Sequence, residues 1–404
     1  MTTPPHHLPL TPSSITAAHT LIKPHIHHTP ILTNKTLNAL ASSPHPRSIL
    51  LDKTPTETHT HTNNDTDTDT DTDTATPKIN FFFKCENLQR IGAFKARGAF
   101  HALLRLVEVE GVEVVRERGV VTHSSGNHAQ ALSLASSTLS IPCTIIMPTI
   151  STPSKISGTA AHGARILFSG STSVEREALV AEVMRETNAF LIPPYDHPDI
   201  ILGQGTVGYE MAGQVGELLA GQPGLSVHFG TGDCKEGAGE LDAVITPVGG
   251  GGLNAGVATY FADRAGTLVF GAEPSYQGGD DCARGLREGR RVERVSTLTV
   301  ADGLRTPVGV IPWGVISDSS KVAGVYAVSE EEILAAMRLV LERMKVVIEP
   351  SAAVGVAVVL FNEEFRARVV RECKEGGLSG WDVGVVFSGG NTTVERIGEL
   401  FAKK

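Results

Sequence analysis

The sequence predicts an α/β protein built on open parallel sheets. Short apolar runs, with the length and composition of buried strands, alternate with longer segments of helical periodicity. Of the 404 residues, 41% are hydrophobic and 42 residues are glycine, which allows a large core and many tight turns. Repeated strand–helix units imply parallel strands, helices on both faces, and ligands at the carboxyl ends of the strands.

Several elements of this pattern can be placed along the chain. The runs expected to form strands are Phe81–Lys84, Val120–His123, Cys143–Met147, Arg165–Phe168, Phe190–Ile192, Ala243–Pro247, Leu268–Ala272 and Val383–Phe387. The helical stretches expected between or after them include Ala129–Ser137, Val174–Glu186, Thr206–Leu219, Glu330–Met344 and Ala352–Phe361.

Composition and charge exclude several classes of protein. The formal net charge is −9, and part of it lies in the Asp-Thr run, so the mildly acidic body argues against nucleic-acid binding. No segment has the signature of a signal peptide or a membrane span, and a cytoplasmic protein is expected. The five cysteines are odd in number and form no CxxC motif, which favours neither a disulfide framework nor a cysteine zinc site.

A low-complexity insert occupies Lys53–Pro77 and ends in five Asp-Thr dipeptides. It lacks the apolar side chains that could offset its ordering entropy, and a disordered loop is expected. Its residues His59 and His61 could bind a metal ion weakly, but a solvated insertion is the favoured interpretation. A second surface excursion is expected at Gly230–Gly237.

Two segments indicate cofactor chemistry. Lys95 follows Phe94 in a Gly-interrupted loop that leads into a helix. A buried lysine with a lowered pKa is a nucleophile toward aldehydes, of which pyridoxal phosphate is the usual one in enzymes. Taken alone, Lys95 would more often be a solvated surface residue. The run Gly249–Gly252 lies between an apolar segment and a helical pattern, and its backbone can bind a phosphate. Its presence favours the interpretation of Lys95 as a cofactor-binding residue.

Two further strand–turn motifs complete the pattern. The segment Thr122–Gln130 runs from a strand into a helix, and its backbone N–H groups form a natural seat for a carboxylate. An ordinary helix-capping turn is an equally good interpretation of that segment by itself. The segment Val385–Asn391 again passes from a strand to a glycine turn, with Ser388 at the tip.

In this order, the four segments resemble fold type II pyridoxal-phosphate enzymes, which are similar to the tryptophan synthase β subunit. The resemblance is strongest to the serine racemase and serine/threonine dehydratase group, including threo-3-hydroxyaspartate dehydratases. It extends from His28 to Asn391. Further matching motifs are Gly203–Thr206, Gly271–Pro274, Ala301–Gly303 and Ile348–Ala352.

The resemblance implies two α/β domains with the cofactor in the cleft between them. Residues 1–118 and 196–404 would form a large pyridoxal-phosphate-binding domain, and residues 119–195 a small one. The resemblance also assigns the cofactor contacts: Lys95 would carry the cofactor covalently, Phe94 would lie beside its ring, Asn127 would contact its phenolic oxygen, Gly249, Gly250, Gly251, Gly252 and Leu253 would hold its phosphate, and Ser388 would meet its pyridine nitrogen.

The resemblance also implies how a substrate is bound. An uncharged hydroxyl such as Ser388 makes the cofactor ring a weaker electron sink than an Asp would, which favours β-elimination over transamination. The substrate carboxylate would lie on the loop that includes Ser124, Ser125, Asn127 and His128. Arg176 could assist there, although a solvated helix position is the slightly favoured interpretation of that residue.

Ser125 bears on the type of reaction. Inversion at Cα needs a second acid/base group opposite the lysine, and the resemblance assigns that catalytic role to Ser125 beside Lys95. Tyr195 and the pair His128-Ala129 are instead typical of dehydratases. A divalent ion, Mg²⁺ or Ca²⁺, is also expected at Glu273, Gly279 and Asp281, with a merely acidic turn as the alternative, because hard cations prefer oxygen ligands.

The leading hypothesis is a dehydratase that eliminates water from serine, threonine or threo-3-hydroxyaspartate to give an oxo acid and ammonia. Racemisation of serine is left open as an additional activity, and a homodimer is expected. A dedicated serine racemase is the alternative within enzymes. A pyridoxal-phosphate-binding sensor or scaffold without turnover is the alternative outside them.

Overall fold

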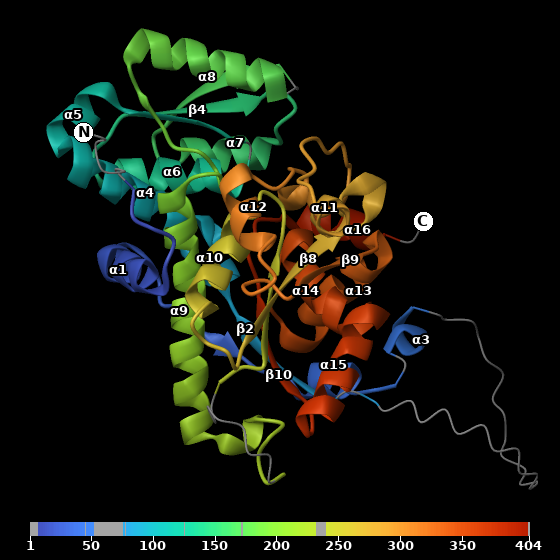
Figure 1. The fold of residues 1–404 in the computed structure, drawn as a ribbon. Helices are drawn as coiled ribbons and strands as arrows, with labels where there is room; N and C mark the ends of the chain where they lie inside the picture. The colour runs from blue at the N-terminus through green and yellow to red at the C-terminus, as the bar shows by residue number, and fades with distance from the viewer. Residues whose placement is uncertain are drawn as a thin grey trace, which may run out of the picture.

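The computed structural model describes residues 7–44, 46–51, 76, 78–124, 126–170, 173–231 and 240–402. Its strands form two open sheets, one of six strands in the order β1-β2-β10-β7-β8-β9 and one of four in the order β5-β4-β3-β6. Figure 1 shows the smaller sheet and its helices stacked on one end of the larger body. Apart from Thr76, the insert Lys53–Pro77 lies outside the described residues, as does most of the second excursion.

The larger sheet is parallel except at one edge. Its strands are β1 (Ile31–Leu32), β2 (Ile79–Lys84), β7 (Ala243–Pro247), β8 (Leu268–Pro274), β9 (Gly324–Val328) and β10 (Trp381–Val386). The predicted strands pair in parallel, and the additional strand β1 pairs antiparallel with β2. Neither β1 nor β9 was expected, because β1 has only two residues and β9 is half-buried along much of its length.

The smaller sheet is fully parallel and contains β3 (Val120–His123), β4 (Cys143–Pro148), β5 (Arg165–Ser169) and β6 (Phe190–Leu191). Helix α8 (Ser173–Thr187) covers one face, and α6 (Asn127–Thr138) and α7 (Pro153–Ala160) cover the other (Figure 1). The two parallel-sheet units that were predicted are therefore present. Their boundaries at residues 118/119 and 195/196 stay a prediction.

Helices cover both faces of the larger sheet because its strand residues alternate between two cores. Phe81 and Phe83 pack into the core that contains α14 (Pro350–Phe361), while Phe82 packs into the core with α9 (Pro198–Gly221) and α10 (Gly252–Phe261). The remaining helices are α1 (Pro12–Ile22), α2 (Lys35–Ala41), α3 (Pro46–Leu50), α4 (Lys95–Glu110), α5 (Val112–Arg118), α11 (Asp281–Glu288), α12 (Val310–Ile316), α13 (Glu330–Leu339), α15 (Glu363–Gly376) and α16 (Val394–Phe401). Among the described residues, no helix has the length and apolar character of a membrane span.

A buried ion network joins β2, α4 and α9. The Arg97 guanidinium donates to both oxygens of Glu86, at 2.7 and 2.8 Å, and to both oxygens of Glu210, at 2.9 and 2.7 Å. Lys84 Nζ donates to Glu210 Oε2 at 2.7 Å and to the Thr29 carbonyl at 2.8 Å. Two cations therefore face two anions inside the protein. The network fixes the start of α4, where Lys95 lies.

We predict that Arg97→Met lowers the free energy of unfolding by about 3–5 kcal/mol, because Glu86 and Glu210 would lose buried charge partners. Urea titration followed by circular dichroism would measure the loss. Arg116→Ala is the matched control, since Arg116 pairs with exposed Glu113 and surface pairs contribute at most about 1 kcal/mol. Equal effects of the two substitutions would contradict a stabilising role for the network.

Candidate active site

The predicted cofactor residues follow three neighbouring strands of the larger sheet. β10 lies between β2 and β7 and is parallel to both. The loop after β2 leads to Lys95, Ser388 follows β10, and Gly249 follows β7. Because parallel strands end at the same edge of a sheet, the structure brings the lysine, the serine and the glycine run to one edge.

Lys95 begins α4, with its side chain half-buried. Its Nζ donates a hydrogen bond to the Pro194 carbonyl at 2.6 Å and lies 5.2 Å from the centroid of the Phe94 ring. Burial lowers the pKa of Lys95 to about 8. A larger fraction of the amine is therefore neutral near pH 7 than in an exposed lysine, and only the neutral amine attacks an aldehyde.

The backbone before Lys95 is tied to the segment that contains Ser388. The Phe94 N–H donates to the Ser388 carbonyl at 3.0 Å, and the Gly390 N–H donates to the Gly92 carbonyl at 2.9 Å. Ile91 has φ +57°, a conformation that is unfavourable for a β-branched residue. The Asn391 amide donates to the Ile91 carbonyl at 2.7 Å and helps to hold this turn. Phe94 and Ser388, both predicted cofactor contacts, are thus neighbours in space.

The glycine run has the geometry of a phosphate cradle. Gly251 has φ +84° and precedes α10, and no side chain caps this helix. The first N–H groups of a helix lack acceptors within the helix, so those of Gly252 and Leu253 are available to an anion. A Cβ at Gly250 would lie 2.3 Å from the Tyr195 ring, and one at Gly249 would lie 2.9 Å from a backbone carbon. Only glycine can therefore occupy these two positions. With its free N–H groups, the run is suited to bind a phosphate group.

Asn127, at the start of α6, connects the smaller sheet to the larger one. Its amide nitrogen donates to Glu349 Oε1 at 2.9 Å, and its oxygen accepts from the Asn391 amide at 2.7 Å. Burial and, to a lesser extent, the nearby charge of Asp302 raise the pKa of Glu349 to about 7. Neither Glu349 nor Asn391 was among the predicted site residues. The available signal for Glu349 was its position as the one acidic residue in the segment Ile348–Ala352, at the start of an apolar helical run.

The expected substrate loop lies between β3 and α6. The Ser124 hydroxyl accepts from the Gly126 N–H at 3.3 Å, whereas Ser125 lies outside the described residues. The buried ring of His128 is hydrogen-bonded through Nε2 to the Ile192 carbonyl at 3.1 Å. Burial and the Lys95 charge lower the pKa of His128 to about 3, so the ring is neutral. A substrate contact by His128 stays a prediction, and its backbone N–H in the first turn of α6 is the available donor.

Arg176 is half-buried in the first turn of α8. Burial lowers the pKa of His123, and the positive charge of Arg176 lowers it further. The same charge acts on Tyr195, whose pKa is raised chiefly by burial. Arg176 therefore lies within electrostatic range of two residues that border the predicted cleft. Its contact with a substrate stays a prediction.

The expected metal ligands Glu273 and Asp281 are both buried. Glu273 accepts hydrogen bonds from the Cys282 and Ala283 N–H groups at 3.1 and 2.7 Å, and Asp281 accepts from the Val308 N–H at 3.3 Å. Burial raises the pKa of Glu273 well above its usual range and that of Asp281 to about 6. Gly279 lies in the same turn. Among the described residues neither carboxylate forms an ion pair, and binding of a divalent cation by these two residues stays a prediction.

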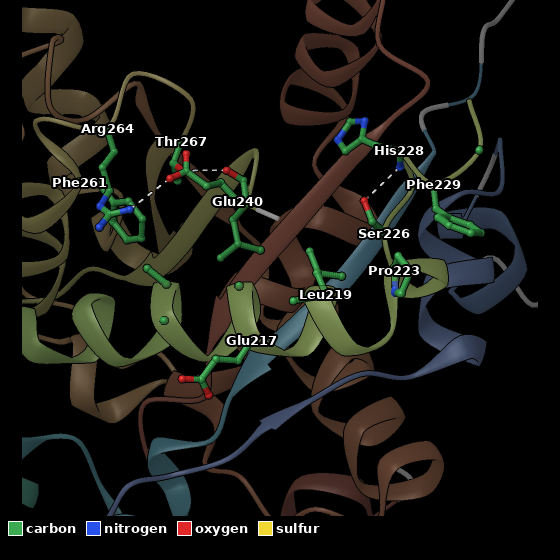
Figure 2. A pocket seen from close by; sticks show the side chains of 16 residues that line it. Glu217, Leu219, Pro223, Ser226, His228, Phe229, Glu240, Phe261, Arg264 and Thr267 are labelled. Carbon is green, nitrogen blue, oxygen red and sulfur yellow. Dashed lines mark hydrogen bonds and ion pairs between the residues drawn. The ribbon is translucent and has the colours of Figure 1, made fainter. Parts of the chain in front are cut away.

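A separate cavity of about 720 Å³ lies near the C-terminal half of α9 (Figure 2). Leu219, His228, Phe229 and the ion pair of Arg264 with Glu240 line it, and none of the predicted site residues does. Ala212 is the first residue of α9 that lines the cavity. At 1.5 Å per residue, it lies roughly 21 Å along the helix from Pro198, where α9 begins. The cavity is therefore distinct from the edge where Lys95 lies.

Comparison with known proteins agrees with this arrangement. A family model described as "Pyridoxal-phosphate dependent enzyme" matches residues 69–389. A serine racemase from Arabidopsis thaliana is 34% identical, over 96% of this chain and 95% of the relative. An L-threo-3-hydroxyaspartate ammonia-lyase from Saccharomyces cerevisiae is 36% identical, over 80% of this chain and 86% of the relative. The crystal structure of a serine racemase from Dictyostelium discoideum has a TM-score of 0.71 at 34% identity and covers 95% of this chain and 99% of its own.

We predict that apoprotein captures pyridoxal phosphate at a rate that rises with pH, with a midpoint near pH 8, and levels off above about pH 9. A pKa of about 8 leaves roughly 10% of the Lys95 amine neutral at pH 7, against roughly 0.03% at the ordinary value of 10.5. Stopped-flow absorbance would give the profile. Lys95→Ala should remove this phase, and Lys374→Ala, at an exposed position, should retain it. A midpoint near pH 10 would contradict the lowered pKa.

Proposed function

Because this chain belongs to the family of pyridoxal-phosphate-dependent enzymes, we propose that it is a dehydratase acting on β-hydroxy amino acids, with racemisation of serine as a second activity. The products of elimination would be an oxo acid and ammonia. The observation that carries the proposal is Lys95, whose amine lies against the Pro194 carbonyl at the edge that also bears Ser388 and the glycine run.

Residues of this chain account for cofactor binding. Gly249–Leu253 would hold the phosphate, Phe94 would lie beside the ring, Asn127 would contact the phenolic oxygen, and Lys95 would form the covalent link. When bound, pyridoxal phosphate withdraws electrons from Cα of an attached amino acid, as loss of a β-hydroxyl requires. Ser388 would offer the ring nitrogen an uncharged hydroxyl, which favours elimination.

Lys95 is also the proposed base. Its amine, with a pKa of about 8, would accept the Cα proton of the substrate near neutral pH. The neutral ring of His128 adds no competing positive charge beside it. The substrate carboxylate would lie on the N–H groups that begin α6, with Arg176 as an additional cation.

The choice of β-hydroxy substrates rests on the relatives. One is named for L-threo-3-hydroxyaspartate and others for serine, and all of these amino acids carry an oxygen substituent at Cβ. A second carboxylate, as in 3-hydroxyaspartate, would need a further cationic contact, and Arg176, whose charge acts on His123 and Tyr195, is the proposed one.

The proposed reaction predicts different outcomes for the two enantiomers of serine. Purified protein should form oxo acid and ammonia from L-serine or L-threo-3-hydroxyaspartate, and it should interconvert L- and D-serine. Ser125→Ala should lower racemisation and elimination from D-serine by about 10²–10⁴-fold, because it removes the acid/base group opposite Lys95. Elimination from L-serine, which needs only Lys95, is the internal control.

Coupled assay of oxo acid and chiral chromatography of serine would separate the outcomes. Equal losses for both enantiomers would assign Ser125 to substrate positioning. A wild-type protein without activity on D-serine would be an L-specific dehydratase, and one without activity on any hydroxy amino acid would contradict the proposed function.

We further propose that Glu273, Asp281 and a carbonyl of the turn that includes Gly279 bind Mg²⁺ or Ca²⁺. The support is the pair of buried carboxylates in this turn, because hard cations prefer carboxylate and carbonyl oxygens. Assembly as a homodimer and a cytoplasmic location also remain predictions of the sequence.

Chelation should test this metal site. We predict that EDTA lowers the melting temperature of wild-type protein and that added Mg²⁺ or Ca²⁺ restores it, since a ligand that binds only the folded state stabilises that state. Glu273→Gln should melt at the same temperature with and without EDTA. A chelator response that persists in Glu273→Gln would place the ion elsewhere.

A further inference from the structure

A second group of potential metal ligands lies where the N-terminal segment meets the start of α9. His7, His197 and Asp199 each offer one ligand atom, and these atoms all lie within 4.8 Å of one another. His7 Nδ1 is 3.1 Å from Asp199 Oδ2, and His197 Nδ1 is 4.0 Å from the same oxygen. The rings of His7 and His197 meet edge to face, with centroids 4.6 Å apart. Three ligand atoms thus converge from two distant parts of the sequence.

The Asp199 carboxylate has unused bonding capacity. Its side chain is only 6% exposed, and its Oδ1 is buried without a hydrogen-bond partner among the described residues. Such an oxygen loses its hydration without compensation, which costs free energy. A bound cation beside this carboxylate would offset that cost.

The imidazole of His197 is in a suitable state for metal binding. The Asp199 N–H donates to His197 Nδ1 at 3.3 Å, a long hydrogen bond, so Nδ1 bears a lone pair that a metal ion would take over from this N–H. His7 is 45% exposed, so a fourth position of a tetrahedral ion could be filled by water.

We propose that His7, His197 and Asp199 form a Zn²⁺ site. Two imidazoles and one carboxylate suit zinc and other late first-row metals better than they suit Mg²⁺ or Ca²⁺, which prefer oxygen alone. The site is independent of the proposed reaction, and its ligands are not those of the Glu273 and Asp281 pair.

The position of this site at the start of α9 implies a structural role for a bound zinc ion. His197 caps α9 and lies two residues beyond Tyr195, whose ring packs on Gly250. Asp196, between them, accepts from the Val310 and Ile311 N–H groups at 2.9 and 2.8 Å and so caps α12. A metal ion on His197 and Asp199 would tie the N-terminal segment to the connection that also supplies the Pro194 carbonyl to Lys95.

Titration of holoenzyme with ZnCl₂ tests the site. The protein should carry no polyhistidine tag, and excess Mg²⁺ should be present to occupy hard-oxygen sites. A competing chromophoric chelator would report affinity and stoichiometry. We expect one Zn²⁺ per chain at this site, with binding weakened roughly tenfold or more in His7→Ala and in Asp199→Asn. Co²⁺ should give the visible bands of a tetrahedral ion in wild type and not in these variants.

His27→Ala is the matched control, because His27 is an exposed histidine outside the cluster. It should bind Zn²⁺ with wild-type affinity. His7 is half-exposed near the chain end, so His7→Ala keeps the test valid even where Asp199→Asn fails to fold. Unchanged affinity in His7→Ala, a loss confined to His27→Ala, or no Zn²⁺ binding by wild type would each overturn the proposal.

Discussion

The Arg97 guanidinium lies two residues beyond Lys95 and is held by two buried carboxylates that come from different parts of the chain. Glu86 follows β2 and Glu210 lies within α9, and Lys84 adds a second cation to the same network. Removing four charges from water is costly, so the arrangement is stable only because every cation meets an anion with short hydrogen bonds. The position of α4, and hence of the amine of Lys95, depends on this balance.

The site itself depends on strand order. β10 is the last strand in sequence, yet it inserts between β2 and β7 and brings Ser388 beside the loop of Lys95 and the glycine run. Residues near the smaller sheet contact the larger unit at two points. The Asn127 amide donates a hydrogen bond to Glu349, and Lys155 forms an ion pair with Asp302 at 2.5 Å. These contacts join the two parallel-sheet units beside the predicted cofactor residues.

The sequence predicted the fold class and the main strands well because buried parallel strands are continuous apolar runs with turn residues at their ends. The Gly249–Gly252 run and Lys95 could also be recognised, because each lies in a short motif of residues that are neighbours in sequence. Glu349, Asn391 and the Pro194 carbonyl were not, since their roles arise from contacts between residues far apart in sequence. The cluster of His7, His197 and Asp199 could not be predicted from the sequence either, because only the folded chain brings residue 7 to the start of α9.

The central claim is that Lys95 is the residue to which pyridoxal phosphate is covalently bound. Purified holoenzyme can be reduced with borohydride, digested, and mapped by mass spectrometry for the pyridoxyl group. The structure predicts the label on the peptide that contains Lys95 and on no other lysine. A label on a different lysine, or its absence from a yellow protein, would contradict the account.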